Sequence, residues 1–136
     1  MESLTIGQLA RKAGVGIETV RYYERRGLIQ EPPRMESGYR EFPTEAVDQL
    51  RFIRRAQELG FSLREIKELL SLRLTPSCNC DRVLQRTEDK IADIKTRIRS
   101  LRRMERALEK LATACRQRET SSKCPILEAL DAREGL

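Results

Sequence analysis

Residues 5–29, TIGQLARKAGVGIETVRYYERRGLI, have the pattern of two short helices joined by a tight turn. Thr5 stands three residues before a glutamine, which is the spacing of a capping box, and apolar residues then recur with helical periodicity. Gly14 permits the sharp reversal that two steeply crossing helices need. A second helix is predicted over residues 17–26, and Gly27 is placed to end it in a left-handed conformation.

The second predicted helix has an apolar side and a polar side. Val20 and Tyr23 are expected to turn inward, which leaves a polar face that fits a DNA major groove. Arginine on such a face reaches guanine edges or phosphates, and a tyrosine hydroxyl hydrogen-bonds a phosphate. The solvated face of an ordinary helix pair has the same spacing, so the pattern alone leaves both interpretations open. The candidate DNA-contacting residues are Glu18, Thr19, Arg21, Tyr22 and Arg25.

The segment after these two helices predicts a β-hairpin, or wing. Pro32 and Pro33 exclude a helix, and residues 38–42 follow a polar turn with the pattern of a short strand that closes the hairpin. Tyr39 and Arg40 would lie near its tip, where they suit contacts with a DNA backbone. A partly buried ring and a solvated charge explain the same two residues equally well.

Two further helices are predicted after the wing. Thr44 is placed to cap the first of them, which carries apolar residues at helical spacing and stops near Gly60. Ser62 and Glu65 repeat the capping-box spacing and begin the second. Together with the helical pair and the wing, these elements predict a small winged helix-turn-helix domain over residues 3–72.

The second half of the chain predicts one long helix. Residues 80–115 contain no proline or glycine and are rich in arginine, lysine, glutamate, leucine and alanine. Less polar residues recur there in steps of three and four, which is the stripe of a coiled coil. Between a cysteine at each end, the stripe consists of Leu84, Thr87, Ile91, Ile94, Ile98, Leu101, Met104, Leu108 and Leu111.

The stripe is symmetric about the middle of the helix. Cys80 mirrors Cys115, Leu84 mirrors Leu111, and the residues between them pair in the same way. Two antiparallel copies would therefore set each apolar side chain against another, as a two-fold interface requires. Packing of the helix on its own domain is the alternative, but the rest of the chain offers too little apolar surface to cover it. We predict a homodimer, with residues 73–115 as linker and dimerisation helix.

Three cysteines are predicted to meet across this dimer. Cys80 and Cys115 are 35 residues apart, or roughly 50 Å along a helix, so one chain cannot bring them together. Antiparallel pairing sets Cys80 of one chain beside Cys115 of the other. Cys124 follows a polar loop and directly precedes Pro125, a favoured first residue of a helix, and a helix start favours the thiolate.

Three thiolates in a chain without histidine favour a soft metal ion. Structural zinc usually takes four ligands, whereas Hg(II) accepts low coordination and prefers sulfur. For each cysteine taken alone, a buried small hydrophobe is the alternative. Cys78 adds a thiol that either is a spectator or supplies a fourth sulfur for cadmium, lead or zinc. The expected fold is mainly α: the winged domain, the long antiparallel coiled-coil helix, and a metal-binding loop and C-terminal helix over residues 116–136.

Composition narrows the class of protein. The 136-residue chain has a net charge of +6, which suits a polyanion such as DNA but also fits a merely soluble basic protein. No window of about 18 uncharged apolar residues exists, so we expect a cytoplasmic protein with no membrane partner. With no histidine and no CxxC pair, a thiol enzyme is not expected. A structural zinc dimer that binds DNA constitutively is a further alternative.

Three runs in order, IGQLARKAGVGIETVRYYERRGLI (6–29), SGYREF (37–42) and FIRRAQELGFSLREIKELL (52–70), resemble the DNA-binding domain of the MerR family of transcriptional regulators. The resemblance extends over residues 3–72. It implies a helix-turn-helix with residues 17–26 as the recognition helix. It therefore favours DNA contact over the solvated-face interpretation.

The cysteine spacing, with CPI at the last cysteine, resembles that of the mercury-responsive members of the family. The resemblance implies that Hg(II) is the effector, bound by Cys115 and Cys124 of one chain and Cys80 of the other. It also implies repression of promoter DNA without metal. With metal, the DNA bends and untwists so that RNA polymerase starts on mercury-resistance genes. Lead and cadmium sensors share much of the cysteine pattern, so a regulator that responds to Pb(II), Cd(II) or Zn(II) is the alternative.

Overall fold

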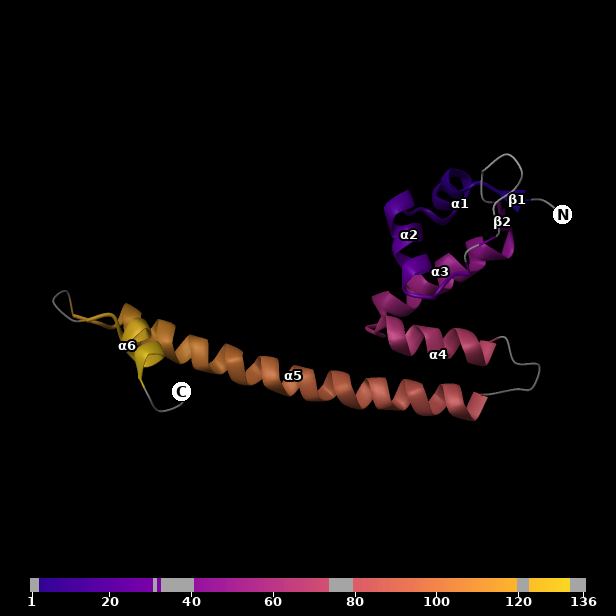
Figure 1. Cartoon of the computed structure of the whole chain (residues 1–136). Coiled ribbons are helices and arrows are strands. Elements are labelled where there is room, and N and C mark those ends of the chain that lie inside the picture. The colour runs from indigo at the N-terminus through magenta and orange to yellow at the C-terminus, as the bar shows by residue number, and fades with distance from the viewer. Residues whose placement is uncertain (1–2, 31, 33–40, 74–79, 120–122, 133–136) are drawn as a thin grey trace. The chain divides into compact units, whose positions relative to one another are not determined.

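A computed structural model describes residues 3–30, 32, 41–73, 80–119 and 123–132 of the chain (Figure 1). Six α-helices and two short strands lie in the described part, which confirms the predicted mainly α fold. The chain divides into two compact units, Met1–Thr87 and Glu88–Leu136. The first unit holds the helix-turn-helix and its core, and the second holds most of the long helix and the C-terminal segment.

Helices α1 (Ile6–Ala13) and α2 (Ile17–Arg25) form the predicted helical pair. The capping box at the start of α1 is complete, because the Gln8 backbone N–H donates to Thr5 Oγ1 at 3.2 Å and the Thr5 N–H donates to Gln8 Oε1 at 3.0 Å. Gly14 ends α1 with a φ of 72°, in the left-handed region. The tight turn therefore forms where a residue without a Cβ atom is available.

The end of α2 also follows the prediction. Gly27 has a φ of 77°, and the Leu28 N–H donates across the turn to the Tyr23 carbonyl at 2.9 Å. Leu28 and Ile29 are buried directly after the turn. This apolar pair anchors the chain as it leaves α2.

The strand predicted near residue 42 pairs with a second strand that was not predicted. Strand β2 (Phe42–Pro43) pairs antiparallel with β1 (Ser3–Leu4) at the start of the chain, with Leu4 opposite Phe42. Both of these side chains are buried, so the pair closes one edge of the core. The wing itself, with the candidates Tyr39 and Arg40, lies outside the described residues.

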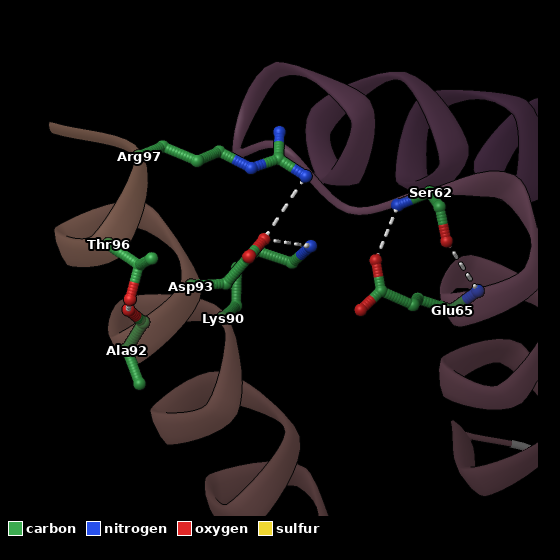
Figure 2. Close-up of polar contacts among 7 residues, drawn as sticks. All are labelled: Ser62, Glu65, Lys90, Ala92, Asp93, Thr96 and Arg97. Atoms are coloured by element: carbon green, nitrogen blue, oxygen red, sulfur yellow. Dashed lines mark hydrogen bonds and ion pairs between the residues drawn. The ribbon is translucent and has the colours of Figure 1, made fainter. Parts of the chain in front are cut away.

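Helices α3 (Glu45–Glu58) and α4 (Leu63–Arg73) complete the first unit. Thr44 stands at the N-cap of α3, but the prediction that it caps the helix is wrong for its side chain, which makes no capping hydrogen bond. The predicted capping box of α4 is confirmed, because Ser62 and Glu65 exchange hydrogen bonds of 2.7 and 3.2 Å (Figure 2).

The core of the first unit lies where α1 and α2 pack with α3 and α4. Its largest fully buried side chains are Phe42, Leu9, Leu50, Ile53, Ile66 and Val20. Burial of each such side chain contributes about 1.5–3 kcal/mol relative to exposure. Polar bonds add orientation to this core: the Arg54 guanidinium donates to the Ala13 and Gly14 carbonyls at 3.4 and 3.0 Å.

Helices α5 (Cys80–Arg116) and α6 (Pro125–Asp131) form the rest of the described chain. Helix α5 is continuous over 37 residues, which confirms the predicted long helix, and Lys90 is its one buried residue. The Asp93 carboxylate pairs with Lys90 at 3.6 Å and Arg97 at 3.2 Å along the helix surface (Figure 2). No helix in the described ranges is both long enough and apolar enough to cross a membrane.

Candidate metal centre and nucleic-acid interface

The polar face predicted on the recognition helix is present on α2. Val20 and Tyr23 point into the core, whereas four of the candidate residues are exposed and Thr19 is half-buried. The Arg21 guanidinium donates to the Glu18 carboxylate at 3.1 Å, one turn apart on this surface. Because both partners are largely exposed, this ion pair is weak and is easily exchanged for a contact with another anion.

The two neighbouring tyrosines of α2 have different surroundings. The Tyr23 hydroxyl donates to Gln57 Oε1 of α3 at 2.6 Å, and burial raises the pKa of Tyr23 above its ordinary value. Tyr22 is 42% exposed, and the Arg26 guanidinium lies 6.0 Å from its ring centroid. Tyr23 is therefore held in the core, whereas Tyr22 stays accessible to solvent.

Cys115 and Cys124 lie together in the second unit, at the junction between α5 and α6. Cys115 occupies the last turn of α5, and Cys124 is the N-cap of α6, as predicted. Both thiols are half-buried and free of disulfide bonds. The Arg118 side chain bends back onto the end of α5, where its Nη1 donates to the Cys115 carbonyl and lies 3.5 Å from the Cys115 Sγ.

The surroundings of Cys124 favour its thiolate. The backbone amides of Leu127 and Ile126 face the sulfur and lower the pKa of the Cys124 thiol, although neither closes a full capping hydrogen bond. Desolvation raises this pKa, but by less than the amides lower it. The Cys115 thiol and the Arg118 charge lower it further. The thiolate is the form in which a cysteine binds a metal ion, and soft cations prefer sulfur ligands.

Cys80 is the first residue of α5 and is exposed, at the opposite end of the helix from Cys115. It lines a groove of about 870 Å³ between α3, α4 and the start of α5. Arg86 holds this end of α5 on α4 through two contacts with Glu68 Oε1, at 2.6 and 2.7 Å. Cys78, the possible extra ligand, lies outside the described residues.

Within one chain the described cysteines do not complete a metal site. No group of three metal-ligating side chains converges anywhere in the described part of the chain. Two of the three predicted ligands are therefore brought together by the fold, and the third is separated from them by the length of α5. The predicted site needs a second copy of the chain.

The predicted dimer stripe of α5 is uncovered in the single chain. Ile94 is 39% exposed, Leu101 is 62% exposed, and most of the other large apolar side chains of the stripe lie between these values. Leu111 alone among them is half-buried. A row of large apolar side chains on a helix surface indicates an interface with another protein surface.

Arg118 is the residue near the candidate centre that sequence reasoning missed. It lies three residues after Cys115 in an arginine-rich stretch, where many cations look alike. Its one distinguishing signal was that spacing, which allows a side chain to fold back onto the preceding helical turn.

Two family matches cover most of the chain. Residues 4–72 match the MerR HTH family regulatory protein family, and residues 47–111 match the MerR DNA-binding family. The chain belongs to the MerR family of transcriptional regulators. MerR-family proteins regulate transcription through DNA-binding domains and are not enzymes. Membership of the family therefore confirms the prediction of a DNA-binding regulator and the prediction that the chain is not an enzyme.

Relatives within the MerR family match both units of the chain. The mercuric resistance operon regulatory protein of Bacillus cereus is 47% identical over 125 residues, covering 92% of this chain and 95% of its own. The dual function transcriptional regulator MerR of Bacillus megaterium MB1, solved in complex with mercury(II), has 43% identity and a TM-score of 0.73 over 95% of this chain and 100% of its own. A transcription regulator of Ralstonia metallidurans CH34, solved in complex with lead(II), has 38% identity and a TM-score of 0.83 over 93% and 98%.

Proposed function

We propose that this chain is a cytoplasmic, Hg(II)-responsive transcriptional regulator that binds promoter DNA as a homodimer. Without metal it represses, and with metal it distorts the DNA so that RNA polymerase transcribes mercury-resistance genes. The observation that carries the proposal is the thiol pair of Cys115 and Cys124, placed at the far end of the helix that begins with Cys80. The mercury(II) complex and the mercuric resistance regulator among its relatives support the choice of metal.

The uncovered stripe of α5 supports the dimer. Full burial of a large aliphatic side chain contributes about 1.5–3 kcal/mol, and each stripe side chain would gain the part of this that its exposed surface represents; summed over the stripe, this gain favours association. Its symmetry about the helix middle fits an antiparallel two-fold arrangement, in which Leu84 meets Leu111 of the second copy. The same arrangement carries Cys80 to the thiol pair of the other chain.

The thiol chemistry supports Hg(II). Cys115 and Cys124 of one chain, with Cys80 of the other, would supply three sulfur ligands and no nitrogen. Soft sulfur ligands select soft ions, and the lowered pKa of Cys124 reduces the cost of releasing a proton on binding. The bound ion would supply a strong link between two subunits at each end of the α5 pair.

The DNA-binding unit supplies the output in this proposal. The exposed face of α2, with Glu18, Thr19, Arg21, Tyr22 and Arg25, would enter the major groove, and Tyr39 and Arg40 of the wing would contact the backbone. Bending and untwisting a promoter costs a few kcal/mol, which is comparable with the coupling free energy that one bound ligand supplies. The free energies of metal coupling and of DNA distortion are thus of the same order.

A Pb(II)-, Cd(II)- or Zn(II)-responsive regulator is the second candidate. It is favoured by the similarity to the lead(II)-bound regulator and by Cys78, whose thiol would raise the number of sulfur ligands to four. The two candidates differ in which metal acts at the lowest concentration and in whether Cys78 is required.

In vitro transcription from the cognate promoter tests the proposal, with Hg(II), Cd(II), Pb(II) and Zn(II) added in turn. The wild-type protein should respond to Hg(II) at the lowest concentration. Cys80→Ser should lose this response, and Cys78→Ser, the matched control, should keep it. A normal Hg(II) response of Cys80→Ser contradicts the ligand assignment, and loss of the response in Cys78→Ser contradicts the three-ligand site.

Mixed dimers test whether the ligands come from two chains. Cys80→Ser protein is mixed with protein that carries Cys115→Ser and Cys124→Ser, and subunits are allowed to exchange. Each homodimer lacks a complete site, whereas the mixed dimer should regain one of its two sites and bind one Hg(II) per dimer tightly. Absence of tight binding in the mixture contradicts the shared site.

A further inference from the structure

The Arg118 side chain places a cation beside both thiols at the junction of α5 and α6. Its Nη1 donates to the Cys115 carbonyl and lies 3.5 Å from the Cys115 Sγ. The positive charge of Arg118 also acts on the Cys124 thiol, whose pKa it lowers. One guanidinium is therefore close to the two sulfurs that the fold brings together within a single chain.

Other cations of the same segment are directed elsewhere. The Lys123 ammonium, next to the second cysteine in the sequence, lies 4.0 Å from the Glu128 carboxylate. The Arg116 guanidinium donates to a threonine hydroxyl one turn back along α5. Among the described residues, none of the ion pairs includes Arg118. The charge of Arg118 is therefore not neutralised by any carboxylate in the described part of the chain.

The charge of the proposed metal centre gives this cation a role. A cysteine binds a metal ion as a thiolate, which carries one negative charge. Thiolates from Cys115 and Cys124 of one chain and Cys80 of the other would exceed the charge of a divalent ion by one negative unit. With the same ion, two thiolates would give a neutral centre, and a fourth thiolate would add a second negative unit. The three-thiolate centre is therefore the one that a single positive charge balances.

An unbalanced negative charge would disfavour this centre. Cys115 and Cys124 are half-buried, and partial removal from water disfavours a charged group. Residues that contact the ligands of a metal ion typically change metal affinity by about 10- to 100-fold when they are mutated. Arg118 is exposed, so solvent and salt screen its charge, and we expect the lower end of this range.

We propose that Arg118 balances the negative charge of a three-thiolate Hg(II) centre and so favours binding by three sulfurs over binding by two or four. Arg118 is not itself a ligand, because a protonated guanidinium offers no lone pair to a metal ion. The third thiolate comes from the other chain, so Arg118 would strengthen the link that the metal makes between two subunits. The inference rests on the proposed ligand set and adds a determinant of selectivity to it.

A double-mutant cycle on the full-length dimer tests this role. Competition with a small-molecule thiol gives the Hg(II) affinity of four proteins, all of which carry Cys78→Ser to exclude a fourth sulfur. They are the reference protein, Arg118→Gln, Cys80→Ser and the combination of the last two. Arg118→Gln should weaken binding about tenfold in the reference protein, where the centre is anionic. It should have little effect in the presence of Cys80→Ser, where the centre is neutral. An equal loss in both backgrounds overturns the proposal.

Further measurements separate an effect of charge from an effect on local structure. Arg118→Lys keeps the charge and should retain most of the affinity. The ratio of affinities between the reference protein and Arg118→Gln should shrink as salt is added, because ions screen an exposed charge. X-ray absorption should show the mean number of sulfur ligands per Hg(II) falling from three toward two in Arg118→Gln. A ratio that does not depend on salt, or three sulfurs with undiminished affinity in Arg118→Gln, overturns the proposal.

Lys123→Gln is the matched control, because it removes a cation of the same segment that is paired with Glu128. It should leave the Hg(II) affinity unchanged, and a loss equal to that of Arg118→Gln overturns the specific role of Arg118. Failure of the shared centre has a different signature. If Cys80→Ser binds Hg(II) as tightly as the reference protein, the centre is not shared, and the role of Arg118 is overturned with it. If Cys80→Ser weakens binding and Arg118→Gln does not, the shared centre stands and only the role of Arg118 is overturned.

Discussion

The two units of this protein use apolar residues in opposite ways. The first unit encloses them, since Leu9, Leu50 and Ile53 are completely buried inside its own core. The second unit displays them, with Leu101 and Leu108 more than 60% exposed along α5. The first unit therefore has a core of its own, whereas the second leaves a row of large apolar side chains uncovered. A charge or a cavity in the first unit should therefore affect its folding, whereas the same change in the stripe of α5 should affect dimerisation.

The largest effect is expected from a charge at the middle of the stripe. Ile98 lies at the centre of the symmetric stripe, so Ile98→Asp would bring two carboxylates together in an apolar interface. We expect the Kd of dimerisation to rise by at least about a thousandfold, or about 4 kcal/mol, as measured by sedimentation equilibrium. Thr96→Asp, on the opposite side of α5, should leave the dimer intact. A dimer of normal stability in Ile98→Asp contradicts the antiparallel interface.

A cavity in the core of the first unit should have a smaller effect, and it should change the free energy of unfolding, not dimerisation. Leu50→Ala should reduce the free energy of unfolding of the first unit by about 2–5 kcal/mol, independent of protein concentration. The three tyrosines of the chain all belong to this unit, so tyrosine fluorescence in urea reports its unfolding. The matched variant Leu101→Ala should instead destabilise the dimer, with a loss that grows on dilution. If dilution changes the loss in Leu50→Ala, the two units are not independent in this sense.

A smaller effect is expected at the start of α4. Ser62→Ala removes one half of a complete capping box and should lower the free energy of unfolding by about 1 kcal/mol, measured by thermal unfolding. Thr44→Ala is the matched control, because the Thr44 side chain makes no capping hydrogen bond. Equal losses in the two variants would show that the observed hydrogen bonds do not decide the contribution of a cap.

The smallest effect concerns the thiol pair of the second unit. Arg118→Gln removes the charge that helps to lower the pKa of Cys124, so this pKa should rise slightly and the thiolate fraction near neutral pH should fall. The shift should be small because the backbone amides of Leu127 and Ile126 lower this pKa more than Arg118 does. The pH dependence of Cys124 alkylation, followed by mass spectrometry, measures it. Arg116→Gln should cause no such rise, and an equal rise there would indicate a general charge effect.

The parts of the fold that the sequence predicts are those that depend on residues close together in the chain. The capping boxes at Thr5 and Ser62, the left-handed glycines and the helix that starts after Cys124 each depend on residues a few positions apart. The pairing of β1 with β2 depends on Leu4 and Phe42, which are 38 residues apart, and two-residue strands carry no periodicity to reveal it. Thr44 has the right residue type, but its backbone, with φ −61° and ψ −28°, is already helical and not in the extended conformation that a capping side chain needs.

The candidate metal centre likewise has residues that the sequence identifies and contacts that only the tertiary structure reveals. Cysteines are few and their spacing is informative, so Cys80, Cys115 and Cys124 are identified from sequence, and the structure places two of them together. Their joint coordination of a metal stays a prediction. Arginines are many, and the position of Arg118 beside Cys115 depends on how the chain turns back on itself. Abundant residue types acquire a specific role only through tertiary structure.

The bonds that join α2 and its preceding turn to α3 have a consequence for how a promoter is selected. Arg54 donates to the carbonyls of the turn, and Gln57 accepts from the Tyr23 hydroxyl. Helix α3 therefore holds α2 through side-chain hydrogen bonds at two separate points. A surface fastened in this way does not remodel itself to suit each base sequence that it meets. In the proposed complex, any misfit between this surface and the promoter would therefore be taken up by the DNA, and the deformability of the DNA would contribute to recognition.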